Sequence, residues 1–515
     1  MRLQRTKNAT RNITYGVMYR MIVILLPFIV RTVMLYIMGA DYVGMNSLFT
    51  SILSFLSLAE LGVGSALVYS MYKPIANDDD DTICALLDLY RKLYRYIGTI
   101  ILVIGVILIP FLKYLVKSDC PADINLYILY GIYLFNTVIS YWLFAYKQSL
   151  LVAFQRTDII SKRSMVIQLS MYAIQIVTLF MFRNYYAYII WLPVSTVITN
   201  LVNSVIVDKM FPQYKCRGVV SKDLEQSIKK KISALFGTKV NSVVMHAADN
   251  IVISAFLGLT MVGKYGNYFY IMNSIIGIMT IIYDSLTAGL GNSLETESVE
   301  KNYQDFNVLS FLNAWIVMFC TTSLVVLYQP FMKIWVHEKL MFGMDMVILL
   351  GVYFYVYQIR RIVLTYKDAA GIWWEDRYRP YVMMVVNLAG NLFMVQFIGI
   401  NGVVFSTIIS MYISLPWENY TVFKYIFNCN SLAYYISLLK YVVTTIICCV
   451  LTWIVSCAMP DGIIGLILKA VCCIIIPNFL YYLFFRNTCE FTDTKEMVWK
   501  RYGSKLMRKI GKENH

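Results

Sequence analysis

The stretch "RMIVILLPFIVRTVMLYIMGADYVG" runs from Arg20 to Gly44. It is long and apolar enough to cross the roughly 30 Å hydrocarbon core of a bilayer as one helix. It nevertheless carries Arg20 and Arg31, although a cation at membrane depth costs from about 3 to over 10 kcal/mol. Such residues usually face a bundle interior or a water-filled cavity. The stretch therefore predicts a membrane-spanning helix whose charges serve a function.

The composition places the whole chain in the membrane. Of 515 residues, 59% are hydrophobic and only 15% are charged, whereas soluble domains carry about 25% charged residues. Apolar segments of about 20 residues recur along the entire length, and no long polar stretch separates them. We therefore expect an all-α integral membrane protein without an extramembrane catalytic domain.

The apolar runs, bounded by charged and turn residues, predict about fourteen transmembrane helices. Six of these lie near residues 13–38, 45–72, 93–116, 124–149, 164–182 and 187–208. Eight more lie near residues 231–257, 263–291, 304–329, 345–366, 373–397, 401–427, 433–457 and 463–485.

The charges predict how these helices are oriented. The formal net charge is +15, and the cations concentrate in alternate connections, roughly 35 on one side against roughly 7 on the other. This asymmetry follows the positive-inside rule, so it explains the basic composition without a nucleic-acid partner. We expect both termini in the cytoplasm, which requires an even number of spans.

The chain after the longest cytoplasmic connection, residues 209–230, resembles its own beginning. An offset of 219 residues places Arg20 on Lys239, and it aligns the turns "MGADYVGMNSLF" and "LGLTMVGKYGNY". A shift of six helices preserves orientation, so the halves would be parallel repeats around a central cavity. We predict an N-terminal bundle in residues 1–208 and a second bundle in residues 231–427.

Four side chains are candidate ligands for an anion in that cavity: Arg20, Arg31, Lys239 and His246. Arg20 and Arg31 share nearly one helix face, roughly 16 Å apart along the axis. Cations in a low-dielectric cavity attract phosphate, and arginine adds bidentate geometry. The alternative for Arg20 and Lys239 is that their long side chains extend to the lipid headgroups.

Three acidic residues near membrane depth are candidates for ion coupling: Glu60, Asp249 and Asp284. Each has a structural alternative. Glu60 could neutralise Arg31 from the neighbouring helix, and His246 could form a packed hydrogen-bonded pair with Asp249 one turn away. The sequence leaves these interpretations open.

Motifs for cofactor or metal chemistry are missing from the sequence. It contains no GxxxxGK[ST] loop, no HExxH pair and no GxSxG turn. The acidic run at residues 78–81 is expected to begin an amphipathic cytoplasmic helix. Arg360 and Arg361 are expected to end a helix at the cytoplasmic surface. We therefore predict no cofactor and no metal site.

Residues 31–95, "RTVMLYIMGADYVGMNSLFTSILSFLSLAELGVGSALVYSMYKPIANDDDDTICALLDLYRKLYR", resemble the start of Wzx-type polysaccharide flippases of Gram-positive bacteria. These belong to the multidrug, oligosaccharidyl-lipid and polysaccharide exporter (MOP) superfamily. The predicted spans extend the resemblance over essentially the whole chain. It implies two parallel six-helix bundles and two extra C-terminal helices, here residues 433–485. A basic cytoplasmic tail, residues 486–515, would follow.

The resemblance implies movement of an undecaprenyl-pyrophosphate-linked oligosaccharide across the bacterial plasma membrane, for surface polysaccharide synthesis. In related lipid II flippases, cavity arginines on the first helix are thought to hold the pyrophosphate, and the extra helices to guide the lipid tail. Arg20 and Arg31 match these arginines in helix and depth. The implied partners are the lipid-linked oligosaccharide, membrane lipids, and a polymerase and glycosyltransferases of the same pathway.

Two other functions compete with this expectation. A drug/cation antiporter of the same superfamily would depend on the three acidic residues more than on the arginines. A membrane polysaccharide polymerase or ligase would usually place catalytic residues in a large external loop. The longest external connection here, around residues 330–344, is short, so we expect a protein that is not an enzyme.

Overall fold

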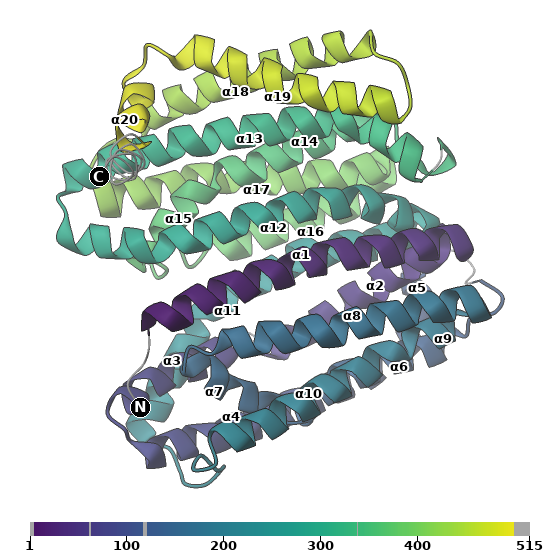
Figure 1. Ribbon diagram of the computed structural model, residues 1–515, viewed down its shortest axis with the longest axis vertical. Helices are drawn as coiled ribbons and strands as arrows, with labels where there is room; N and C mark the ends of the chain where they lie inside the picture. Colours follow the sequence, from purple (N-terminus) through teal and green to yellow (C-terminus); the bar gives the residue numbers. More distant parts are fainter. Residues whose placement is uncertain (1–4, 61–62, 117–120, 337, 499–515) are drawn as a thin grey trace, which may run out of the picture. The chain divides into compact units, whose positions relative to one another are not determined.

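The computed structural model describes the backbone of residues 5–60, 63–116, 121–336 and 338–498, and this part consists of helices and connections without a strand (Figure 1). The all-α prediction is confirmed. The helices up to the predicted linker are α1 Arg5–Ile37, α2 Ala40–Leu56, η1 Ser57–Glu60, α3 Val63–Ala76, α4 Asp80–Leu108, η2 Ile109–Phe111, α5 Leu112–Leu115, α6 Leu126–Trp142, η3 Ala145–Lys147, α7 Gln148–Ala153, α8 Thr157–Phe182, α9 Tyr185–Ile189 and α10 Trp191–Met210.

The remaining helices begin within that linker and end near the last described residue. They are α11 Lys222–Leu257, α12 Leu259–Thr296, α13 Val299–Trp335, η4 Glu338–Leu340, α14 Met344–Ile359, α15 Arg361–Ala370, α16 Arg379–Ile398, α17 Ile400–Val422, η5 Phe423–Phe427, α18 Leu432–Cys457, α19 Ile463–Phe485 and α20 Cys489–Val498. The predicted basic tail from residue 499 onward lies outside the described residues.

Eleven helical segments of the described chain are long and apolar enough to cross a membrane, or twelve if α6 and the segment Ala145–Ala153, bent by 48°, form one span. Two further predicted spans have helical counterparts. The span near residues 45–72 is divided into α2, η1 and α3, and α11 has only a shorter apolar part, Val243–Leu257. The count of fourteen therefore stays a prediction.

Contacts group the chain into two compact units. The N-terminal unit is Met1–Gly266 with Asn391–Val403, and the C-terminal unit is Asn267–Gly390 with Val404–His515. The N-terminal unit thus includes α11 and the first turns of α12, beyond the predicted N-terminal bundle. The division into six-helix bundles at residues 208 and 231 remains a prediction.

Two equivalent turns pack against each other inside the N-terminal unit. Gly39 before α2 has φ 104° and Gly258 before α12 has φ 90°, a region that glycine adopts without strain. A Cβ on Gly44 would lie 2.1 Å from the carbonyl oxygen of Leu259, and one on Gly263 would lie 2.4 Å from that of Ala40. The offset of 219 residues predicted from the sequence relates both contacts, so each turn occupies the same place against the other.

The predicted capped, acidic helix start at residues 78–81 is confirmed, and the helix that begins there runs without a break into the predicted span near residues 93–116. Asp79 caps α4 by accepting a hydrogen bond from the Thr82 backbone N–H at 3.0 Å. The Thr82 side chain and this backbone bond lower the pKa of the Asp79 carboxyl. From Asp80 the helical segment continues to Leu115. The acidic residues stabilise its N-terminus through the helix dipole.

The two extra helices pack on α13 in the C-terminal unit, as Figure 1 shows for α18 and α19. Two hydrogen bonds fix α19. Trp315 Nε1 donates to Asn478 Oδ1 at 2.7 Å, and the Tyr481 hydroxyl donates to the Phe311 carbonyl at 2.9 Å. Because hydrocarbon offers no competing partners, such bonds specify where a membrane helix docks.

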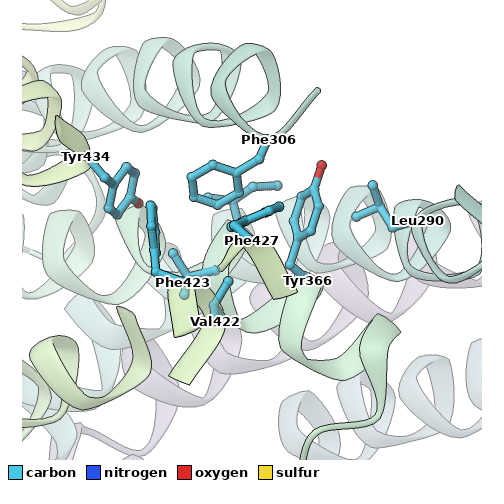
Figure 2. Close-up of a cluster of buried hydrophobic side chains, with 9 residues drawn as sticks. Leu290, Phe306, Tyr366, Val422, Phe423, Phe427 and Tyr434 are labelled. Carbon is cyan, nitrogen blue, oxygen red and sulfur yellow. The ribbon is translucent and has the colours of Figure 1, made fainter. Parts of the chain in front are cut away.

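An aromatic cluster, which we call the Phe306 cluster, holds α15 in the C-terminal unit (Figure 2). The Phe306 ring centre lies 5.1 to 5.5 Å from the ring centres of Tyr366, Phe423, Phe427 and Tyr434. Aromatic pairs at this spacing stabilise a fold beyond the area that they bury. The cluster therefore fixes α15 against α13, α18 and the end of α17.

Candidate functional site

The predicted site residues on α1 lie in a helix that runs along α8. Arg20 is half-buried, and its Nε atom is buried without a hydrogen-bond partner among the described residues. Arg31 is also half-buried, and its Nη2 atom lies 3.4 Å from the carbonyl oxygen of Gly263. The arginine predicted to be deepest therefore lies beside the turn that begins α12.

Gly266, which has no side chain, leaves space for Arg31. A Cβ on Gly266 would lie 2.5 Å from Arg31 Nη2. Only glycine lets the guanidinium approach this part of the α12 backbone. The sequence could not identify this role, because Gly266 carries no chemical group of its own.

The two predicted cations of the second half lie on one helix. Lys239 and His246 belong to α11, but their side chains lie outside the described residues. Their assignment as anion ligands remains a prediction, and so does the pairing of His246 with Asp249.

Asp249 is buried in the N-terminal unit, with 2% of its surface exposed. Its Oδ1 accepts a hydrogen bond from Asn391 Nδ2 at 2.8 Å, and its Oδ2 accepts one from the Tyr265 hydroxyl at 3.2 Å. Both donors are neutral side chains. A buried ionisable group at membrane depth is a candidate for a functional role.

Glu60 accepts hydrogen bonds from two tyrosine hydroxyls. Its Oε1 accepts from the Tyr94 hydroxyl at 2.6 Å, and its Oε2 accepts from the Tyr141 hydroxyl at 2.8 Å. The Tyr90 hydroxyl donates in turn to that of Tyr94 at 3.0 Å. Both carboxylate oxygens are therefore engaged within the α3, α4 and α6 region, at the point where the predicted second span is interrupted.

Asp284 is exposed on α12 in the C-terminal unit. The preceding Tyr283 is buried and donates a hydrogen bond to Asn313 Oδ1 at 2.6 Å. The Arg361 guanidinium lies over the Tyr283 ring, 5.4 Å from its centre. The structure thus places the Arg361 guanidinium against the residue next to Asp284, a contact that the sequence did not predict.

The sequence also missed an ionic network buried inside the C-terminal unit. Arg360 and Glu418 are 5% and 1% exposed and form a bidentate pair, in which Arg360 Nε lies 3.0 Å from Glu418 Oε2. Arg379 Nη1 donates to the same carboxylate at 2.7 Å. Asp376 joins the network by accepting from Arg379 at 2.8 Å and from Lys367 at 2.7 Å. Arg360 does follow the last residue of α14, as predicted, but its side chain is buried against Glu418.

An apolar groove of about 710 Å³ lies on the C-terminal unit, between α13, α14, α17 and α18. Its lining includes Ile348, Val352, Leu439, Ile446 and Trp453. Tyr355 and Thr445 are among its few polar residues. The groove fits a hydrocarbon chain, because almost every wall is apolar.

No protein-family model matches the chain, and no curated protein matches it. Solved structures share its fold. The lipid II flippase MurJ, in an inward closed conformation, has a TM-score of 0.68 at 12% identity, covering 92% of this chain and 99% of that chain. An inward-facing MATE family multidrug resistance transporter of the MOP superfamily has a TM-score of 0.58 at 12% identity, covering 79% and 97%. The MATE multidrug transporter DinF-BH has a TM-score of 0.53 at 17% identity, covering 82% and 96%.

This chain shares the fold of these solved structures. The MurJ and MATE structures both include it, so the fold alone does not separate lipid flipping from drug transport. This shared fold accounts for the all-helical architecture. The roles of Arg20, Arg31 and the acidic residues depend on the surroundings of each side chain.

Proposed function

We propose that this protein is a Wzx-type flippase, which moves an undecaprenyl-pyrophosphate-linked oligosaccharide across the bacterial plasma membrane by alternating access. One observation carries the proposal. A match over 92% of the 515 residues leaves about 41 unmatched, fewer than the 88 residues that follow Phe427. The likeness to MurJ therefore extends into the two extra helices, whereas the 79% match to the inward-facing MATE transporter need not.

The arginines of α1 support an anionic headgroup. Arg20 has a buried Nε without a hydrogen-bond partner among the described residues, and a buried donor left unsatisfied is costly. A pyrophosphate oxygen would satisfy it. In the proposal Arg20, Arg31, Lys239 and His246 bind the pyrophosphate in the cavity.

The apolar groove supports a lipid-linked substrate. One of its walls is α18, the first of the two extra helices. An isoprenoid tail has no polar atoms, and a groove of this composition shields such a tail at no cost in hydrogen bonds. In the proposal the groove holds part of the tail while the headgroup crosses.

The burial of Asp249 favours a role in ion coupling. This role would either accompany lipid flipping or replace it. Its buried carboxyl group accepts hydrogen bonds from Tyr265 and Asn391, and binding of a proton or a small cation there would change the net charge of the site. In a flippase this change would drive the conformational cycle. In a drug/cation antiporter, the second candidate, it would drive efflux.

Replacement of Arg31 tests the proposal. Arg31→Ala should abolish surface-glycan export while membrane abundance stays normal, and Arg31→Lys should restore part of it, since a cation remains without the bidentate geometry. Unchanged export in Arg31→Ala would refute the role of this cation. Drug resistance of a sensitised host, with Asp249→Asn as the comparison, tests the antiporter. Enzymatic polymerisation has no support from the solved structures that share the fold, since those named above are transporters and a flippase.

A further inference from the structure

A short loop of the C-terminal unit carries exposed aromatic side chains that the proposed translocation does not use. This aromatic loop, residues 371–378, has the sequence "GIWWEDRY" and connects α15 to α16. Trp374 is 69% exposed and Tyr378 is 59% exposed. Because tryptophan and tyrosine at the ends of membrane helices often lie at the headgroup level, the residues around these rings decide what they contact.

Arg377 fixes the two rings in position. Its guanidinium carbon lies 4.2 Å from the ring centre of Trp374 and 4.6 Å from that of Tyr378. Its Nη1 donates to the Trp374 carbonyl at 2.8 Å. Cation–π attraction thus holds both rings against one guanidinium. Rings held in this way lose less freedom when a ligand packs on them, which lowers the entropy cost of binding.

Buried charges fasten the end of the aromatic loop. Asp376, 1% exposed, accepts hydrogen bonds from Lys367 on α15 and from Arg379 at the start of α16. Arg379 also reaches Glu418 on α17. The Phe306 cluster holds α15 through Tyr366. Asp376 therefore points inward while its neighbours Glu375 and Arg377 remain at the surface.

The charges at the surface select the ligand. In the described segment from Asp368 to Tyr378, Asp368 and Glu375 are exposed carboxylates and Arg377, partly exposed, is the one cation. Trp373 Nε1 donates to Asp368 Oδ1 at 3.0 Å. Two negative charges against one positive charge disfavour phosphate and anionic lipid headgroups. Carboxylates accept hydrogen bonds from hydroxyl groups, and aromatic faces pack against apolar C–H surfaces. A pyranose ring has both hydroxyl groups and apolar C–H faces.

We propose that Trp374 and Tyr378, with Glu375, form a docking surface for a sugar ring. The sugar belongs to the lipid-linked oligosaccharide, so this inference rests on the proposed function. The aromatic loop lies on the side where the positive-inside rule places the cytoplasm. There it contacts the glycan before translocation, while the pyrophosphate binds the α1 arginines.

Export of surface glycan tests the docking surface in the full-length protein in cells. Trp374→Tyr, which keeps a ring, should export within about twofold of the wild type, and Trp374→Leu should export about tenfold more slowly at equal abundance. Glu375→Gln should also slow export. The control is Tyr425→Leu, because Tyr425 is 51% exposed and its ring lies 5.3 Å from the Lys424 ammonium. It should export normally. Wild-type export in Trp374→Leu would overturn the proposal.

A fluorescence experiment separates sugar docking from membrane anchoring. Wild type and Trp374→Phe are each placed in nanodiscs of ordinary or brominated phospholipid. The fluorescence of Trp374 is the wild-type emission minus the Trp374→Phe emission in the same lipid. Bromine quenches only a ring that inserts among the lipids, so a docking surface predicts no quenching. Strong quenching would show that Trp374 is an interfacial anchor, and the sugar proposal would fall.

Failure of this inference can be told from failure of the flippase proposal. If Arg31→Ala abolishes export while Trp374→Leu does not, only the docking surface is wrong. If Arg31→Ala and Trp374→Leu both export normally, the proposed function fails as well.

Discussion

Thr260 Oγ1 donates a hydrogen bond to Asp41 Oδ1, and these two residues occupy equivalent positions 219 residues apart in the repeat. The hydrogen bond joins the turn between α1 and α2 to the turn between α11 and α12. In the proposed alternating-access cycle, opening toward the predicted outer side would require the two turns to separate.

Crosslinking of these turns should stop transport. In the double variant Asp41→Cys/Thr260→Cys, a short thiol-reactive crosslinker should abolish glycan export, because the turns can no longer part. The single variants, treated in the same way, control for the protein's 11 native cysteines. Export that persists after complete crosslinking would mean that this contact stays closed throughout the cycle.

A methyl group at Gly44 should loosen the same contact. The Cβ of Gly44→Ala would lie 2.1 Å from the Leu259 carbonyl oxygen, so the turns must shift, at a cost of about 1 to 3 kcal/mol. The melting temperature of the purified protein in detergent measures the effect. Gly131→Ala on α6 is the matched control, since its Cβ would meet nothing within 4 Å. Equal melting temperatures for the two variants would show that the turns are not packed as described.

Removal of one carboxylate should damage the buried ionic network. Glu418→Gln leaves Arg360 and Arg379 without their shared partner, and breaking a buried pair in this way costs about 3 to 5 kcal/mol. Glu225→Gln provides the comparison. Glu225 pairs with Lys229 on the exposed surface of α11 at 2.7 Å, and the Lys229 side chain lowers its pKa. Thermal unfolding should separate the variants clearly, with Glu225→Gln close to the wild type.

The sequence predicted the parts of the fold that depend on local patterns. Membrane spans follow from apolar runs, and the repeat was visible because Gly39 and Gly258 occupy a backbone conformation that favours glycine at both turns. The bend after α6 had no such signal, since Phe144 adopts φ 55° without a glycine. The interruption near Glu60 was also missed, because the apolar run continues through it.

Long-range contacts limited what could be predicted of the site. Glu418 and Arg360 are 58 residues apart, and a run of cations at Arg360, Lys367 and Arg379 is what a cytoplasmic connection ordinarily contains. Only the folded chain shows that two carboxylates, Asp376 and Glu418, are buried among them. The neutral partners of Asp249 and the tyrosines around Glu60 come likewise from distant helices.

The reciprocal packing of the two turns has the form of a symmetric homodimer interface contained within one polypeptide. In a true homodimer, a residue at the symmetry axis meets its own copy, so an aspartate there would face an aspartate. Two carboxylates at that distance would repel each other or share a proton. Fusion of the copies removes this restriction, since each can mutate alone. Thr260 opposite Asp41 is such a difference, and the pair forms a hydrogen bond where two aspartates would repel each other.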